Sequence, residues 1–102
     1  MPIVIVLSGP TVTQERYKAA VRLLKGGEGG MQRPGDWPVE GLLSHVAGQG
    51  PQGFRIVDVW DSEDSCRRFG EQLAPVLQQT GITDPPEVYP AQTFVSAALS
   101  HA

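Results

Sequence analysis

The order of strand-like and helix-like segments is the feature of this sequence that most limits its possible folds. Apolar residues recur with strand or helix spacing in six segments: a strand at 2–8, a helix from 14 to 26, strands at 41–49 and 53–61, a helix from 62, and a strand at 87–99. A β-α-β-β-α-β order is typical of the ferredoxin-like fold, an α+β arrangement in which both helices cover one face of a four-stranded antiparallel sheet. We therefore expect residues 1–102 to form a single ferredoxin-like domain.

Glycine, serine and proline residues indicate where these elements end. Gly26 is expected to end the first helix, and Ser62, followed by acidic residues, is expected to begin the second. Pro75 lies within the apolar stripe of the second helix and should kink or shorten its last turn. Pro90 has no amide proton, so the last strand suits a sheet edge or a bulge.

Composition excludes several classes of function. The net charge of −3, with no basic cluster longer than Arg67–Arg68, argues against nucleic acid or an anionic membrane as a partner. Cys66 is the only cysteine and there are two histidines, so a disulfide within the chain and a three-histidine site are impossible, and we expect no metal or other cofactor. The first apolar run, Ile3–Leu7, is too short for a signal peptide or a membrane span, which predicts a cytoplasmic protein.

The strands are apolar on both faces, although two helices can cover only one face of such a sheet. Residues 3–7, 42–46 and 54–60 are each too apolar for one side to face water. A second copy of the sheet is the expected cover. The sequence therefore predicts a homodimer whose two sheets pack face to face.

Two segments carry a resemblance to a known family. GLLSHVAG at 41–48 and GFRIVDVWDSEDSCRRFGEQLAPVL at 53–77 resemble the dimeric α/β-barrel superfamily, in particular small actinobacterial proteins related to antibiotic-biosynthesis monooxygenases. The strand-to-helix signature V-W-[DE]-S-E, here Val59–Glu63, recurs in several branches of that superfamily. The resemblance implies a dimeric α/β barrel with a hydrophobic pocket suited to a flat, aromatic-type substrate. The superfamily includes cofactor-free oxygenases, heme-degrading enzymes, isomerases and aldoxime dehydratases, so the fold alone does not fix the reaction.

The heme-degrading branch of the superfamily is not expected to describe this chain. In that branch a histidine about ten residues after the strand tryptophan, which matches Trp60, binds the iron, whereas this chain has Gly70 and Glu71 there. That branch also has an asparagine near the end of the first strand, which is absent here. Heme degradation is therefore not predicted.

A histidine and an aspartate interrupt the two central apolar strands. If the turn between these strands is centred between Gly50 and Pro51, facing residues have numbers that sum to about 101. His45 then opposes Ile56, and Asp58 lies one diagonal step away on the same face. Trp60, Phe54 and Leu43 are expected on that face too. A register shift of one residue would separate His45 from Asp58.

If the two polar residues share a face, they suit acid–base catalysis. An imidazole held by a carboxylate is a competent general base, so we predict His45 as the base and Asp58 as its partner. Tyr17 on the first helix is the candidate hydrogen-bond donor to an oxyanion. Trp60 and Phe69 are the candidate walls of the substrate pocket. A purely structural role for each of these side chains stays open.

The segment 26–38, GGEGGMQRPGDWP, is long for a connection within a compact domain. Met31 and Trp37 are its apolar anchors and are predicted to bind substrate as part of a lid with glycine hinges. The alternative is a surface loop in which Trp37 packs against the dimer partner. Cys66 lies on an apolar helical stripe and is interpreted as a small buried hydrophobe.

The sequence thus predicts a cofactor-independent enzyme of secondary metabolism that acts on a hydrophobic, polyketide-like small molecule. The reaction would be a monooxygenation or a cyclisation that begins with proton abstraction. Two alternatives remain: a non-catalytic, small-molecule-binding or chaperone-like dimer, and an isomerase or dehydratase of the same fold.

Overall fold

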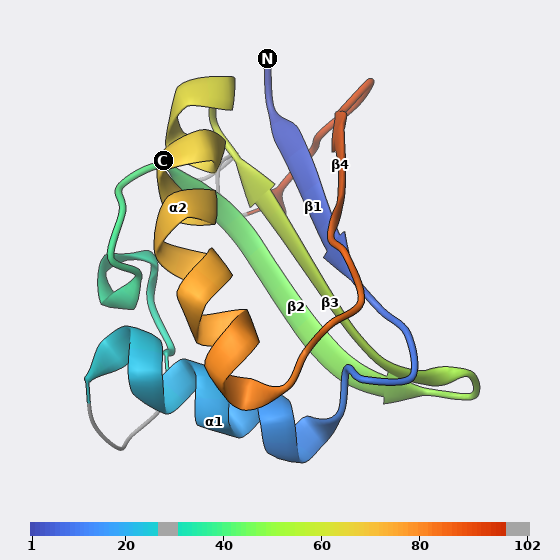
Figure 1. Ribbon diagram of the computed structural model, residues 1–102. Coiled ribbons are helices and arrows are strands. Elements are labelled where there is room, and N and C mark those ends of the chain that lie inside the picture. The colour runs from blue at the N-terminus through green and yellow to red at the C-terminus, as the bar shows by residue number, and fades with distance from the viewer. Residues whose placement is uncertain (27–30, 98–102) are drawn as a thin grey trace.

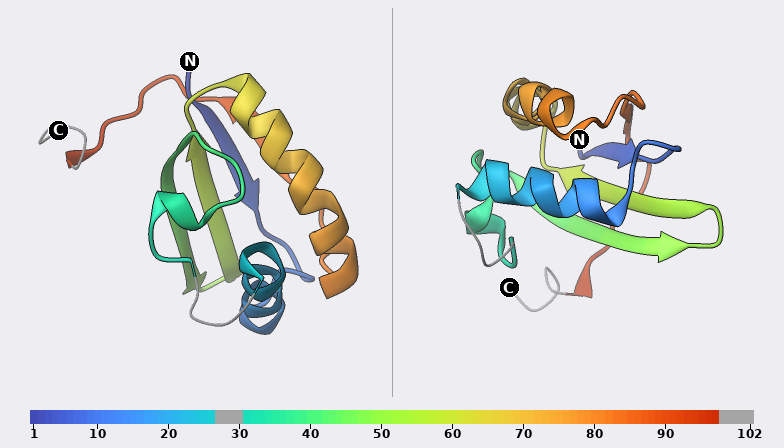
Figure 2. Two further views of the ribbon diagram at one scale, coloured as in Figure 1. Left: turned by 90° about the vertical axis from the view of Figure 1, so that its left-hand side faces the viewer. Right: turned by 60° about the horizontal axis from the view of Figure 1, so that its bottom comes forward.

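The computed structural model describes residues 1–26 and 31–97, which form a ferredoxin-like α+β fold (Figure 1). Its elements are β1 (Ile3–Leu7), α1 (Gln14–Lys25), the short 3₁₀ helix η1 (Pro34–Asp36), β2 (Leu42–Gly50), β3 (Gly53–Trp60), α2 (Glu63–Thr80) and β4 (Glu87–Pro90). The four strands form one antiparallel sheet in the order β2-β3-β1-β4. Both helices lie on the same face of this sheet (Figure 2). The predicted fold class is confirmed.

Side-chain caps define where both helices begin, and left-handed glycines define where they end. The hydroxyl of Thr13 accepts a hydrogen bond from the Arg16 amide at 3.2 Å, and the Ser62 hydroxyl accepts one from the Ser65 amide at 3.1 Å. Gly26 and Gly81 follow the last turns with φ values of 78° and 80°, which glycine adopts without strain.

Pro75 does not shorten α2, because the helix continues to Thr80, whereas the alternative of a kink at Pro75 stays a prediction. A proline within a helix removes one backbone hydrogen bond, but it does not remove the packing of its neighbours. Leu73 and Leu77, on either side of Pro75, are both buried in the core cluster. Burial of these two side chains holds both turns of the helix on the sheet.

The last strand is much shorter than the predicted range 87–99, because β4 ends at Pro90. The next residue, Ala91, donates its amide to the Pro2 carbonyl at 2.8 Å. Residues 91–96 form no strand, and 98–99 lie outside the described residues. After β4 the chain passes to the side of the sheet opposite the helices (Figure 2).

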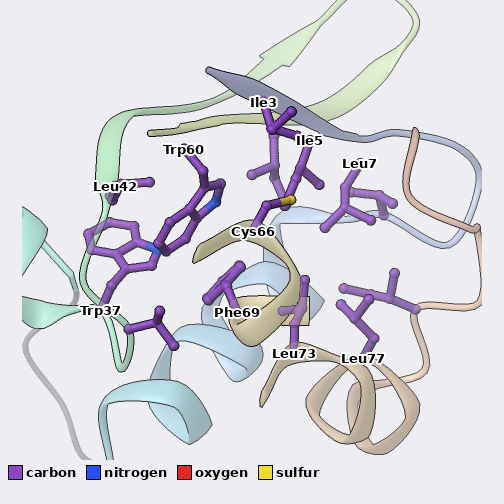
Figure 3. Packing of buried hydrophobic residues seen from close by; sticks show 14 of the residues in the cluster. Ile3, Ile5, Leu7, Trp37, Leu42, Trp60, Cys66, Phe69, Leu73 and Leu77 are labelled. Atoms are coloured by element: carbon purple, nitrogen blue, oxygen red, sulfur yellow. The ribbon is translucent and has the colours of Figure 1, made fainter. Parts of the chain in front are cut away.

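The core lies between the sheet and the two helices (Figure 3). Trp60 is fully buried and stacks on Phe69 of α2, with 4.7 Å between the ring centroids. Among the described residues, no group accepts a hydrogen bond from the Trp60 Nε1. The apolar contacts of this ring must therefore outweigh the cost of one unpaired indole N–H.

Thr11 and Asp84 join the loop after β1 to the loop before β4. The Asp84 carboxylate accepts hydrogen bonds from the Thr11 amide at 2.8 Å and from the Thr11 hydroxyl at 2.5 Å. The same hydroxyl oxygen accepts the backbone amides of Thr83 and Asp84, each at 3.0 Å. The pKa of the Asp84 carboxyl is lowered mainly by the hydrogen bond from the Thr11 hydroxyl and, to a smaller extent, by the bond from the Thr11 amide.

The stabilising effect of Asp84 should therefore depend on pH. A carboxyl whose pKa is lower in the folded state than in the unfolded state stabilises the fold above the unfolded pKa, and that contribution disappears as pH falls through the folded pKa. We expect Asp84→Asn to lower the melting temperature at neutral pH and the difference from wild type to shrink progressively below pH 4. Thermal melts followed by circular dichroism between pH 2 and 7 would measure this. A difference that stays constant across that range would contradict the prediction.

Candidate functional site

The strand register brings His45 and Asp58 directly opposite each other on the face covered by the helices. Facing residues of β2 and β3 in this region have numbers that sum to 103, not 101, so His45 pairs with Asp58 and Ile56 with Ala47. The predicted register was wrong because the turn is centred between Pro51 and Gln52, and Gly53, with φ 128°, begins the returning strand. A shift of two residues keeps every side chain on its expected face.

Leu43 is the exception, because the register of β2 is irregular between Leu42 and Ser44. Leu42 pairs with Trp60, and it is Leu42 that is buried in the core cluster. An irregularity of this kind changes which of two successive side chains faces the core. The expectation that Leu43 shares the face of Trp60 is therefore wrong.

Tyr17, His45 and Asp58 form a continuous chain of hydrogen bonds, here called the triad. His45 Nδ1 lies 2.5 Å from Asp58 Oδ1, and His45 Nε2 lies 2.7 Å from the Tyr17 hydroxyl. An ionised Asp58 can only accept, so His45 donates from Nδ1 and its Nε2 accepts the Tyr17 proton. The triad thus links α1, β2 and β3.

Aromatic contacts fix the plane of the imidazole. The Tyr17 ring is nearly parallel to the His45 ring, at 14° and a centroid distance of 5.9 Å. Trp37 contacts the same imidazole edge-on at 4.8 Å, and Phe54 packs against Tyr17 at 5.2 Å. Geometries of this kind are favourable for aromatic rings and restrict their rotation.

Burial and charge keep the Tyr17 hydroxyl protonated. Burial is the main cause that raises the pKa of Tyr17, and the negative charge of Asp58 raises it further. The phenol therefore acts as a neutral donor to His45 in the resting state. A free tyrosinate is not available as a base near neutral pH.

An apolar cavity of about 40 Å³, here called the inner cavity, lies between the triad and the helices. Six of the seven predicted site residues line it: Tyr17, Met31, Trp37, His45, Asp58 and Phe69. The structure thus brings together residues that are far apart in the sequence. Trp60, the seventh, does not line this cavity or the two larger spaces described below. It lies in the core against Phe69.

The connection between α1 and β2 places its two apolar anchors against the inner cavity. Trp37 is only 9% exposed, and Met31 packs against the core cluster. Asp36 accepts the amides of Gln32 and Arg33, and these two bonds form the turn that leads into η1. Of the glycines predicted as hinges, those at 27, 29 and 30 lie outside the described residues, so the lid stays a prediction.

A second space, here called the outer pocket, lies on the other side of Tyr17 and His45. Its volume is about 380 Å³, and its lining consists of Gln14, Tyr17, Lys18, His45, Ala47, Gly48, Gln49 and Phe54. Lys18 was not predicted from the sequence as a site residue, although it lines this pocket beside the triad. The available signal was spacing, since Gln14 and Lys18 are four apart on a helix and Ala47 and Gln49 follow His45 at intervals of two on a strand.

A groove of about 790 Å³ lies between α2 and β4, and none of the triad residues lines it. Val88 pairs with Ile5 and shares its face, yet it is 57% exposed because no helix covers β4. Cys66 lines this groove as a buried thiol, and burial is the main cause that raises its pKa. A neutral, buried Cys66 agrees with its predicted structural role.

Two further observations concern residues 1–26 and 31–97 only. Within these ranges no three His, Cys, Asp or Glu side chains are grouped closely enough to hold a metal ion. Within the same ranges no helix has the length and apolar content needed to span a membrane.

Comparison with known proteins identifies no relative of this chain. No protein-family model, curated protein or solved structure matches it. The resemblance to the dimeric α/β-barrel superfamily therefore stays a prediction from the sequence.

Proposed function

We propose that this protein is a cofactor-independent enzyme that removes a proton from a hydrophobic small molecule. The observation that carries the proposal is the triad, in which a partly buried His45 is bonded to a carboxylate at one nitrogen and to a phenol at the other. A carboxylate that accepts from Nδ1 fixes the tautomer in which Nε2 can accept a proton. Neighbouring aromatic rings limit the access of water, which strengthens these interactions.

The geometry supports a proton relay through Tyr17. As the substrate's acidic C–H bond breaks, its proton passes to the Tyr17 oxygen while the Tyr17 proton passes to His45 Nε2. The electron pair of the broken bond stays on the substrate as an enolate, and the Asp58 carboxylate stabilises the imidazolium. Tyr17 keeps a proton throughout, in agreement with its raised pKa. Its hydroxyl then points to the enolate as a hydrogen-bond donor.

The enolate can follow either of the two predicted reactions. In a cyclisation it adds to a carbonyl carbon of the same molecule, and the resulting alkoxide takes the proton back from His45. In a monooxygenation the enolate carbon forms a C–O bond with molecular oxygen, and the resulting peroxide takes the proton from His45. Loss of water then breaks the O–O bond and leaves one oxygen atom on the carbon as a carbonyl, so molecular oxygen is the oxidant. An isomerase would instead return the proton to a different carbon of the substrate.

Deuterium exchange tests the shared first step without knowledge of the product. Candidate substrates with a C–H bond made acidic by conjugation with an aromatic ketone, such as anthrone, would be incubated with the protein in D₂O and analysed by mass spectrometry. We expect His45→Asn to lower the exchange rate by about 100-fold or more, because general base catalysis contributes about 10²–10⁴. Exposed Gln72 lies outside the triad, and Gln72→Asn is the matched control. Equal exchange by wild type and His45→Asn would refute the proposal.

The alternative is a binding or chaperone-like protein, in which the outer pocket of about 380 Å³ holds a ligand without converting it. A binder would retain ligand affinity in His45→Asn and would show no exchange in either form. Turnover by the wild type therefore distinguishes the two functions.

We further propose that the protein acts as a homodimer through the helix-free face of the sheet. The strand register places Val4, Val46, Val57 and Tyr89 on that face. Val46 and Tyr89 are 62% and 44% exposed, which leaves apolar area for a second copy to cover. The sheets of the two subunits would then pack face to face as two layers.

Introducing a charge on this face should separate the subunits. We expect Val46→Glu to convert a dimer into a monomer of 11.0 kDa, because an unpaired carboxylate would be buried at the interface. Light scattering after size-exclusion chromatography would measure the mass. Leu23→Glu, at an exposed position of α1, is the control and should leave the mass unchanged. A monomeric wild type would contradict the proposal.

A further inference from the structure

The outer pocket, unlike the inner cavity, is large enough to hold a reactant at the triad. Its volume of about 380 Å³ lies within the usual range for ligand pockets, whereas about 40 Å³ suits only a few water molecules. Tyr17 and His45 line both spaces, so a molecule in the outer pocket reaches the triad without passing the core. The groove of about 790 Å³ is larger, but no triad atom faces it.

The lining of the outer pocket combines one cation with apolar and amide groups. Among the described residues that line it, Lys18 is the only one with a permanent charge. Within the described part of the chain Lys18 forms no ion pair, so its ammonium group is available to a ligand. Phe54 and Ala47 provide apolar surface, and Gln14 and Gln49 provide hydrogen-bonding side chains.

The position of Lys18 also matches the charge that develops during the proposed reaction. Proton transfer to His45 leaves a negative charge on the substrate, next to Tyr17. Lys18 follows Tyr17 directly on α1 and lines the same pocket. Asp58, the carboxylate of the triad, is bonded to the other side of His45 and does not line the pocket. A cation on this side favours an anionic ligand and its more highly charged enolate.

We propose that the outer pocket is the substrate site and that it selects a flat, apolar molecule bearing a carboxylate, whose negative group is bound by Lys18. The apolar body of this molecule packs on Phe54 and Ala47, and its acidic C–H faces the Tyr17 hydroxyl. The inner cavity then serves as the dry apolar backing of the base. The assignment of the reacting C–H depends on the proposed function, whereas the preference for a carboxylate does not.

Binding of a matched pair of probes tests this preference directly. 2-Naphthoate and 2-naphthamide have the same ring system and differ in charge, and the intrinsic fluorescence of the naphthalene reports binding. We expect naphthoate to bind more tightly than naphthamide. Lys18→Gln should weaken naphthoate binding by about 1.5-fold to fivefold, as for an exposed ion pair, and should leave naphthamide binding unchanged. Added salt should reduce the preference for naphthoate. Arg22→Gln is the matched control, since Arg22 lies on the same helix and does not line the pocket.

Two further measurements locate the probe. Naphthoate should shift the NMR signals of the His45 imidazole in wild type, and Ala47→Leu should weaken both probes by filling the apolar side of the pocket. Equal affinity of the two probes, equal loss in Lys18→Gln and Arg22→Gln, or His45 signals that naphthoate does not move would overturn the proposal. A preference for naphthoate without any deuterium exchange would refute only the proposed reaction. If Lys18→Gln did not change the rate of deuterium exchange and the protein bound naphthoate and naphthamide equally, only the assignment of the outer pocket as the substrate site would be refuted.

Discussion

Replacing Asp58 with asparagine should lower the rate of proton transfer by about 100-fold to 10,000-fold. The side chains have nearly the same shape, but an amide cannot stabilise the imidazolium that forms when His45 takes the proton. An amide can also donate through its NH₂ group to Nδ1, which would place the histidine proton on Nε2 and block acceptance from Tyr17. Deuterium exchange into an aromatic ketone would measure the rate.

The same substitution should leave the protein folded, so that its effect on chemistry can be separated from its effect on stability. Asp58 is buried, and a neutral asparagine requires no charge to be removed from water. We expect a melting temperature close to that of wild type. Asp64→Asn is a suitable control, because Asp64 is exposed at the start of α2. Full exchange activity in Asp58→Asn would show that the carboxylate does not assist His45.

The largest loss of stability is expected for Gly9→Ala, at about 2–4 kcal/mol. Gly9 has a φ value of 132°, a backbone conformation that alanine adopts only with strain. A Cβ at this position would overlap the terminal atoms of the Asp84 side chain. Asp84 cannot move aside freely, because its carboxylate accepts two hydrogen bonds from Thr11. The substitution would therefore break these bonds or distort the loop.

Urea unfolding of Gly9→Ala would measure this loss as a lower midpoint with an unchanged slope. Gly48→Ala is the matched control, since Gly48 has no positive φ and a Cβ there would meet no atom within 4 Å. We expect that control to change stability little. A small effect of Gly9→Ala would mean that the loop between β1 and α1 adapts without cost.

The sequence was sufficient to predict the fold and most of the triad for identifiable physical reasons. The order of the elements follows from the spacing of apolar residues. His45 and Asp58 stay on the same face for any register shift by an even number of residues, because side chains alternate between the two faces of a strand. The register itself was two residues off, because the GQGPQG connection allows several turn positions and the φ value of Gly53 decides among them. Local spacing did not reveal the irregularity between Leu42 and Ser44.

Features that depend on tertiary packing were harder to predict. Pro75 was expected to kink or shorten the last turn of α2, but the helix continues to Thr80, and Leu73 and Leu77 hold it on the sheet. The strand at 87–99 was overestimated, because apolar residues after Pro90 suit a strand only where a partner strand is available. Lys18 was missed because helical spacing places it on one face with Gln14 but does not show that His45 of β2 lies beside that face.

The placement of the triad on the sheet also bears on how such a protein can evolve. Asp58 lies on β3, which is paired on both sides, by β1 and by β2 with its His45. The residues that face the outer pocket beside them, Gln14, Lys18 and Gln49, are exposed and contribute little to the core. Substitutions there would change ligand preference at little cost in stability. One proton-transfer apparatus could therefore be kept while new substrates are acquired by mutation at the surface of α1 and the end of β2.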